Sequence, residues 1–101
     1  MMAEFSIIPI GKGVSFSASL AKALDIVDKS GLTYRLGPMG TVMEGNWDQV
    51  MKVIRTCYEN LLQENERIVI NVKIDDQKGP AHHLDDKVTV VEKKLGRTLK
   101  K

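Results

Sequence analysis

Tyr34, Thr41 and Glu44 are the residues whose types and spacing best fit binding chemistry, and they flank a Gly-Pro-Met-Gly turn. The pattern predicts two short strands folded into a hairpin, in which Pro38 sets φ and the glycines adopt backbone angles closed to other residues. We expect the hairpin to bring the three side chains together. A carboxylate can accept from the amino group of a heterocycle, a hydroxyl adds a second hydrogen bond, and an aromatic ring offers a stacking face.

Three serines near the start of the first predicted helix offer further hydroxyl groups. Ser15 or Ser17 is expected to cap this helix, and Ser19 follows closely. The start of a helix also has backbone N–H groups without a partner inside the helix. We therefore add Ser17 and Ser19 to the candidate ligand-binding residues, although capping alone accounts for one of the serines.

One cluster has the residue types of a metal site, and it consists of His82, His83, Asp85 and Asp86. Adjacent histidines point apart on a helix, and two protein ligands are few for a zinc site. Aspartate in the first turn of a helix is already explained by the helix dipole. The sequence therefore predicts no metal site, and no motif indicates a cofactor.

The composition is that of an ordinary globular domain. The chain has 101 residues, of which 43% are hydrophobic and 28% are charged, so we expect one domain over residues 1–101. The net charge of +2 is too small to indicate a nucleic acid as partner. No apolar run approaches the roughly 18 residues of a membrane span, and the N-terminus lacks the pattern of a signal peptide.

Cys57 is the only cysteine, which excludes an internal disulfide and suits a reducing compartment. Its neighbours are apolar, so we expect a buried thiol rather than a nucleophile, which would need a base and electropositive surroundings. Together with the absence of a membrane span, the single cysteine predicts a cytoplasmic protein.

Hydrophobic periodicity predicts seven elements in the order β-α-β-β-α-β-α. Gly31 has the usual place of a glycine after a helix, and Asn46 with Gln49 resembles a capping box at the start of the second helix. The expected strands are 3–10, the hairpin within 33–46, and 67–75, and the expected helical stripes are Leu20, Leu24 and Val27, then Leu84, Val88, Val91 and Leu95. This order predicts an α+β, ferredoxin-like βαββαβ fold, with a four-stranded antiparallel sheet, helices on one face and an added C-terminal helix.

The first predicted strand has apolar residues on both faces. Ile8 and Ile10 point away from Phe5 and Ile7, whereas the two crossover helices can cover only one face of the sheet. Exposed apolar sheet faces are usually interfaces, so we predict a homo-oligomer formed through the open face, either a dimer or a tetramer. The alternative is that the third helix folds over this face.

The chain resembles the thiamine-binding-protein-like family in five motifs that cover nearly its whole length. They are Gly37 to Gly45, Pro9-Ile10-Gly11, the serines that open the first helix, Ser30-Gly31-Leu32-x-Tyr34, and Val72-Lys73-Ile74-Asp75. The resemblance implies a ferredoxin-like fold, dimers or tetramers that pair through their sheets, and a pocket near the hairpin and first helix. It also implies a ligand, since some members bind thiamine or its hydroxymethylpyrimidine part. Asn46 departs from the acid expected in many relatives, which weakens any argument from charge there.

We therefore predict a non-catalytic protein that binds a small molecule, with thiamine or its hydroxymethylpyrimidine moiety as the leading ligand. Its predicted ligand-binding residues are Ser17, Ser19, Tyr34, Thr41 and Glu44. The alternative is a structural or regulatory homo-oligomer without a soluble ligand. An enzyme is disfavoured because no nucleophile–base pair accompanies the candidate residues.

Overall fold

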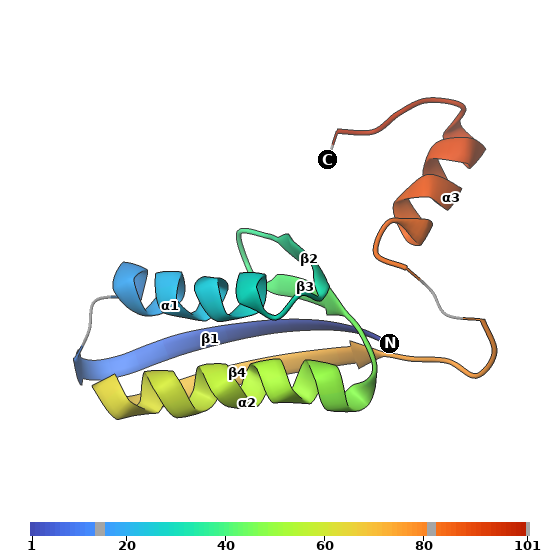
Figure 1. Ribbon diagram of the computed structural model, residues 1–101. Coiled ribbons are helices and arrows are strands. Elements are labelled where there is room, and N and C mark those ends of the chain that lie inside the picture. The colour runs from blue at the N-terminus through green and yellow to red at the C-terminus, as the bar shows by residue number, and fades with distance from the viewer. Residues whose placement is uncertain (14–15, 81–82, 101) are drawn as a thin grey trace.

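The computed structural model describes residues 1–13, 16–80 and 83–100. Its elements follow the predicted order: β1 (Met2–Gly13), α1 (Phe16–Lys29), β2 (Thr33–Leu36), β3 (Thr41–Glu44), α2 (Trp47–Glu64), β4 (Asn65–Asp75) and α3 (Asp86–Leu95) (Figure 1). No helix in these ranges combines the length and hydropathy that crossing a bilayer requires.

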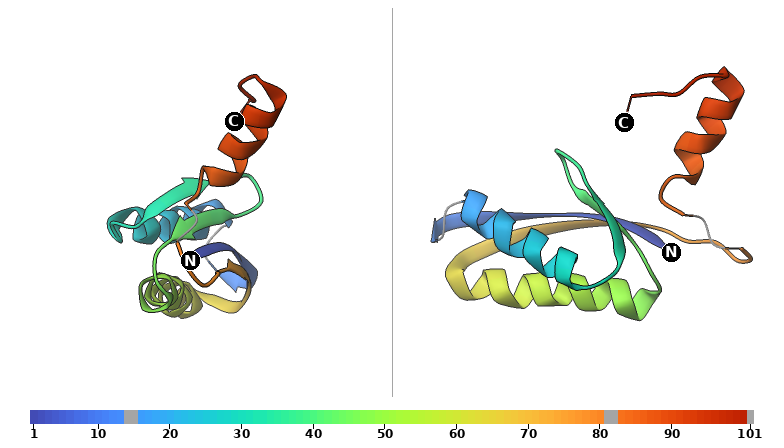
Figure 2. Two further views of the ribbon diagram at one scale, coloured as in Figure 1. Left: turned by 90° about the vertical axis from the view of Figure 1, so that its right-hand side faces the viewer. Right: turned by 45° about the horizontal axis from the view of Figure 1, so that its top comes forward.

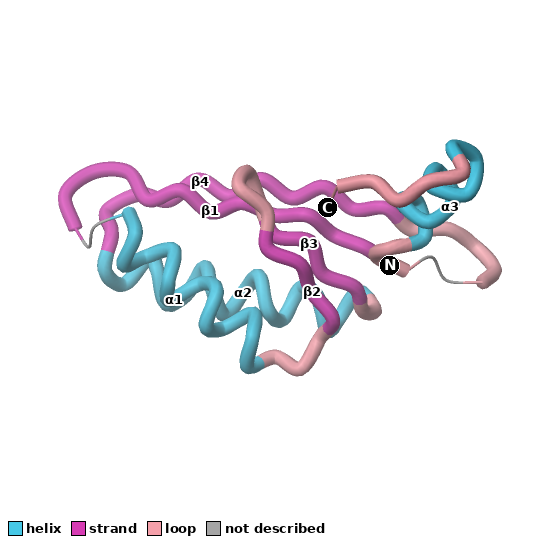
Figure 3. The backbone as a smooth tube through the Cα atoms, turned by 90° about the horizontal axis from the view of Figure 1, so that it is seen from above, coloured by secondary structure: helices cyan, strands magenta, loops and turns pink. Residues whose placement is uncertain are grey.

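The four strands form one antiparallel sheet in the order β2-β3-β1-β4. Both crossover helices, α1 and α2, lie on the same face of this sheet (Figure 3). The arrangement confirms the predicted ferredoxin-like fold.

β1 is paired over a much longer stretch with β4 than with β3. β1 pairs with β4 from Met2, opposite Asp75, to Ile10, opposite Arg67. On its other side β1 pairs with β3 only from Met2 to Phe5, which lies opposite Thr41. The β2–β3 hairpin therefore runs beside only one part of β1, as the tube in Figure 3 shows.

Alternate residues of β1 build the core beneath the sheet. Ala3, Phe5 and Ile7 are buried against the helices, whereas Ile8 and Ile10 on the other face are 41% and 39% exposed. Burying a large apolar side chain stabilises a fold by about 1.5–3 kcal/mol. The remaining buried apolar residues are Ala23, Val27, Met43, Val50, Val53, Ile54, Cys57 and Leu61.

The start of α2 has the predicted capping box. The Asn46 side chain accepts from the Gln49 backbone N–H at 2.8 Å, and the Gln49 side chain accepts from the Asn46 N–H at 3.0 Å. Two N–H groups that the helix leaves unpaired are thereby satisfied. This cap fixes the point at which the chain leaves β3 and enters α2.

The turn between β2 and β3 is held by a hydrogen bond from the Gly37 N–H to the Gly40 carbonyl, at 2.9 Å. The prediction of special backbone angles at Gly37 and Gly40 is wrong, because the glycines with positive φ among the described residues are Gly11, Gly31, Gly79 and Gly96. The requirement at Gly37 is space: a Cβ there would lie 2.8 Å from the Gly40 oxygen.

α3 stands apart from the sheet and helices (Figure 2). None of its side chains is buried, and the predicted stripe residues Val91 and Leu95 remain exposed. The radius of gyration, 15.4 Å, exceeds the roughly 13 Å of a compact domain of this length. α3 therefore leaves Ile8 and Ile10 of the open sheet face uncovered.

Replacing Gly37 with alanine should destabilise the protein by about 1–3 kcal/mol, because the new Cβ forces the two ends of the turn apart. Urea unfolding followed by circular dichroism would measure the loss. Met39→Ala is the matched control in the same turn, since the Met39 side chain is 89% exposed and should change stability by about 0.5 kcal/mol or less. Equal stability of the two variants would contradict this account of the turn.

Candidate ligand-binding site

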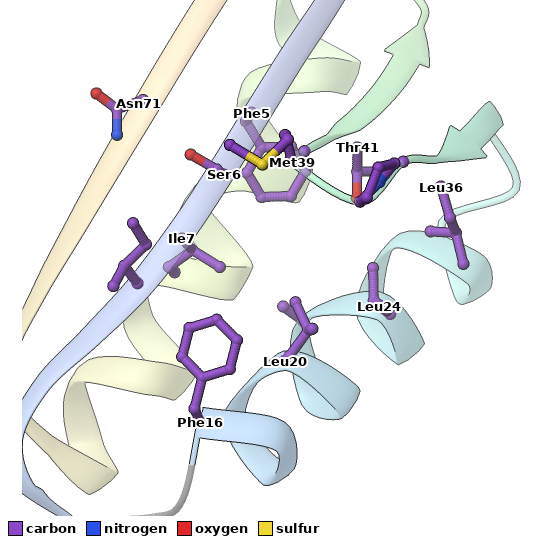
Figure 4. Close-up of a pocket in the computed structure, with 15 residues that line it drawn as sticks. Phe5, Ser6, Ile7, Phe16, Leu20, Leu24, Leu36, Met39, Thr41 and Asn71 are labelled. Atoms are coloured by element: carbon purple, nitrogen blue, oxygen red, sulfur yellow. The ribbon is translucent and has the colours of Figure 1, made fainter.

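A groove of about 430 Å³ lies between α1, the edge of β1 and the β2–β3 turn. We call it the α1–β1 groove. Figure 4 shows Phe16, Leu20 and Leu24 of α1 on one side and Ile7 of β1 on the other. Its complete lining is Phe5, Ser6, Ile7, Ile8, Phe16, Leu20, Ala23, Leu24, Leu36, Gly37, Pro38, Met39, Gly40, Thr41 and Asn71.

The lining of the groove is mostly apolar and carries no charged side chain among the described residues. Its polar side chains are Ser6, Thr41 and Asn71. Thr41 is nearly buried, and its hydroxyl has no hydrogen-bond partner in the part of the chain that the structure describes. Ligand pockets commonly combine apolar walls with a few placed polar groups, in volumes of about 300–1,000 Å³.

The groove exists because α1 presents two of its leucines to it rather than to the core. Leu20 and Leu24 were predicted as part of the inner stripe, but Leu20 is exposed and Leu24 half-buried. The buried residues of α1 are Ser19, Ala23 and Val27. The stripe is therefore rotated by one residue, and small Ser19 and Ala23 allow α1 to approach β1 and α2.

Tyr34, Thr41 and Glu44 do not come together as the sequence suggested. Thr41 lies at the turn end of β3, opposite Leu36, whereas Glu44 lies at the other end, opposite Thr33. Side chains three positions apart on a strand also point to opposite faces. Thr41 faces the helices and borders the groove, and Glu44 faces the open side of the sheet.

Tyr34 shares the helix-facing side of the hairpin with Met43, its partner in β3. Its hydroxyl donates to Asp28 of α1 at 2.6 Å. This hydrogen bond, with burial and the charge of Asp28, raises the pKa of Tyr34. Tyr34 therefore joins the hairpin to the end of α1 and does not line the groove.

Glu44 binds the segment that leads into α3. One carboxylate oxygen lies 2.9 Å from His83 Nδ1, and the other accepts from the Leu84 N–H at 3.4 Å. Arg35 of β2 forms an ion pair with Asp85 beside it. We call these interactions the C-terminal contact. A second hollow of about 480 Å³ borders it and includes Glu44, Gly45 and His83 in its lining.

Gly45 lies close to the capping box of α2. A Cβ at Gly45 would lie 3.1 Å from the Gln49 side-chain oxygen and 3.4 Å from Leu32. A residue larger than glycine would therefore press against the capping box and Leu32 at this position.

The two candidate serines have separate surroundings. Ser17 is exposed in the first turn of α1, because the helix begins at Phe16, and Ser15 lies outside the described residues. Ser19 is fully buried, and its hydroxyl accepts from the Asn65 side chain at 3.3 Å. Neither residue lines the α1–β1 groove. The hydrogen bond of Ser19 instead connects α1 to Asn65, where α2 ends and β4 begins.

The remaining reactive residues do not extend the site. Cys57 is a free, buried thiol, as predicted, and burial raises its pKa to about 11. Among the described residues no three His, Cys, Asp or Glu side chains converge on a metal position, and His82 of the weak candidate cluster lies outside those residues. Trp47, at the start of α2, is 58% exposed.

Sequence comparison connects these features to known proteins. The chain matches the thiamine-binding protein family over residues 3–92. It belongs to that family. The UPF0045 protein MJ1052 of Methanocaldococcus jannaschii is 37% identical over 95 residues, which are 94% of this chain and 88% of that protein. The UPF0045 protein of Methanothermobacter thermautotrophicus is 32% identical over 92% of this chain and 97% of its own length.

Two solved structures share the fold of this chain. The crystal structure of MJ1052 aligns with a TM-score of 0.81 at 34% identity and covers 89% of this chain and 93% of that one. A candidate thiamine biosynthesis or salvage protein of Thermotoga maritima aligns with a TM-score of 0.78 at 21% identity, over 89% of this chain and 96% of that one. The resemblance read from the sequence motifs is thereby confirmed at the level of family and fold.

The groove residues contributed by α1 and the turn were not among the residues predicted for the site. Phe16, Leu20, Leu24 and Met39 look like core or loop residues in the sequence. The signal that pointed nearby was the Gly-Pro-Met-Gly run itself, which is part of the motif from Gly37 to Gly45 and forms one end of the groove.

The C-terminal contact should weaken as the pH rises. The hydrogen bond and charge of Glu44 raise the pKa of His83 above its ordinary 6.5. Because the folded-state pKa is raised, the stabilisation is fully present below pH 6.5 and is lost as the pH rises through the raised value.

An NMR titration of the His83 ring in the parent and in Glu44→Gln measures this coupling. The variant should titrate closer to 6.5, since a neutral amide provides no charge for the imidazolium. Asp48→Asn, which removes a carboxylate from the first turn of α2, should leave the titration unchanged. Identical His83 titrations in the parent and Glu44→Gln would show that the contact does not form in solution.

Proposed function

We propose that the protein is a non-catalytic, small-molecule-binding protein that holds thiamine or its hydroxymethylpyrimidine moiety in the α1–β1 groove. The observation that carries this proposal is the groove itself, with apolar walls, the unpaired Thr41 hydroxyl and no charged side chain among its described lining residues. A flat, uncharged heterocycle fits such a lining, because apolar rings gain from burial and a few polar groups set the orientation. Membership of the thiamine-binding protein family supports the ligand class.

The lining favours the pyrimidine over the charged parts of thiamine. A thiazolium ring or a phosphate would find no opposite charge in the groove, and burying an unpaired charge is costly. We therefore propose that the pyrimidine ring enters the groove and that any charged substituent stays in solvent. The structural similarity to the candidate thiamine biosynthesis or salvage protein of Thermotoga maritima agrees with this class of ligand.

The site residues of this proposal differ in part from those indicated by the sequence. Thr41 remains, and the groove residues of α1 replace Ser17, Ser19 and Tyr34, whose side chains lie elsewhere. Glu44 faces the opposite side of the sheet and binds the segment before α3. The cytoplasm remains our proposed location, because the one cysteine is a free thiol and suits a reducing compartment.

Thermal-shift and calorimetric titrations with thiamine and 4-amino-5-hydroxymethyl-2-methylpyrimidine test the proposal, because a ligand that binds only the folded state raises its melting temperature. Leu20→Lys should weaken binding by about tenfold or more, since an apolar wall is lost. Thr41→Val should cost about tenfold or less, since one neutral hydrogen bond is lost.

Two control variants locate the site. Leu62→Lys changes a leucine of similar exposure on α2, outside the groove, and should bind like the parent. Glu44→Gln should also bind like the parent. Loss of binding in Glu44→Gln but not in Leu20→Lys would move the site to the hollow beside the C-terminal contact. Absence of binding by both ligands would favour the alternative function.

The alternative is a structural or regulatory homo-oligomer, and exposed Ile8 and Ile10 on the open sheet face favour assembly. We propose that copies of the chain pair through this face into a dimer or tetramer, with or without a ligand. Val42 and Val69 on the same face are half-buried and extend the apolar surface.

Ile10→Lys should shift the protein from oligomer toward a monomer of 11.3 kDa, because the substitution places a charge in the proposed interface. Light scattering at micromolar concentration measures the mass. Leu62→Lys, with equal exposure on the helical side, should leave the mass unchanged. A parent protein that is already monomeric would refute the assembly.

A further inference from the structure

The edge of β1 is unpaired where it borders the groove. β3 ends its pairing with β1 at Phe5, but β4 stays paired with β1 without a break as far as Ile10 and again at Gly13. From Ser6 onward β1 therefore has a neighbouring strand on one side only. A free strand edge presents backbone N–H and C=O groups that lack partners.

Two contacts show which residues of β1 direct their backbone groups toward this edge. The Met1 carbonyl accepts from the Gly45 N–H at 3.1 Å, and the Phe5 carbonyl lies 3.2 Å from where a Cβ on Gly40 would stand. Both carbonyls point to the β3 side. Because backbone groups alternate between the two sides of a strand, Ile7 points to the β3 side as well, and Ser6 and Ile8 point to β4.

Pro9 supports this assignment independently. It lies within the ladder, opposite Ile68, yet proline has no N–H to donate. Proline is tolerated in a strand where its nitrogen faces a free edge. Pro9 has the same direction as Ile7, so its nitrogen faces the free edge and the β1–β4 ladder stays intact.

The backbone N–H and C=O of Ile7 therefore face the groove. Continuing the register of β1 and β3 would bring Met39 opposite Ile7, but the chain has already turned there, and within the described ranges Ile7 has no partner in β3. Thr41, one position beyond the last turn residue, lines the same groove. The backbone donor and acceptor of Ile7 therefore lie in the same groove as the Thr41 hydroxyl.

We propose that the Ile7 backbone pair recognises the edge of a heterocycle in which a ring nitrogen adjoins an amino group. The Ile7 N–H donates to the ring nitrogen, and the amino group donates to the Ile7 carbonyl. The ring then takes the place of the missing residue of β3, between β1 and the leucines of α1. This proposal rests on the proposed function, because it uses the same groove and ligand class.

The recognition discriminates by hydrogen bonds rather than by charge. An analogue in which a methyl group replaces the amino group has nearly the same shape but leaves the Ile7 carbonyl without a donor. A buried acceptor left unpaired is costly. We therefore expect 2,4-dimethyl-5-hydroxymethylpyrimidine to bind about tenfold or more weakly than 4-amino-5-hydroxymethyl-2-methylpyrimidine.

Amide hydrogen exchange followed by NMR tests the edge directly. In the free protein the Ile7 amide should exchange about tenfold or more faster than that of Ser6, which faces the β4 ladder and serves as the internal control. The aminopyrimidine should slow exchange at Ile7 and leave Ser6 unchanged. The methyl analogue should not protect Ile7 at equal concentration.

The outcomes separate this inference from the proposed function. If the aminopyrimidine binds but the Ile7 amide is unaffected and the methyl analogue binds equally well, the inference is wrong and the proposed function stands. If neither compound binds, both proposals fail. If Ile7 is protected in the free protein and its protection rises with protein concentration, a strand of another copy occupies the edge and the inference is overturned.

Discussion

The long antiparallel ladder between β1 and β4 is the interaction on which the rest of the structure depends. It pairs each residue of β1 from Met2 to Ile10 with a residue of β4, and the alternation of the paired strand directs Phe5 and Ile7 toward the helices. β3 needs no such length, because β1 is already supported from the other side. The unequal lengths of these neighbours leave part of β1 bare, and the groove lies there.

Charge is separated from the groove by the sheet itself. The described lining of the groove has no ionised side chain, whereas Glu44, His83, Arg35 and Asp85 interact at the far end of the hairpin. The alternation of side chains along β3 causes this separation, since Thr41 faces the helices and Glu44 faces the open side of the sheet. β3, which is only four residues long, therefore contributes one residue to the neutral groove and another to the charged C-terminal contact.

Features of the fold with a local cause could be predicted from the sequence, and those with a tertiary cause could not. The capping box at Asn46 and the glycine after α1 depend on neighbours within a few residues, so both can be predicted from the local sequence. The separation of Thr41 from Glu44 also follows from the period of a strand, and the error lay in reading the hairpin as one cluster. The groove depends on β3 ending before β1 does and on α1 turning Leu20 away from the core. Neither feature can be predicted from the spacing of apolar residues in the sequence, because both depend on how the helix and strands pack against one another.

The register of the central ladder also orders the events of folding. Met2 lies opposite Asp75, so β1 completes its main pairing only after the chain as far as Asp75 has been synthesised. Contacts between such distant segments form slowly, since the intervening loop must close first. Until then β1 carries both an apolar row and two bare edges, which makes the nascent chain a candidate for chaperone binding during translation.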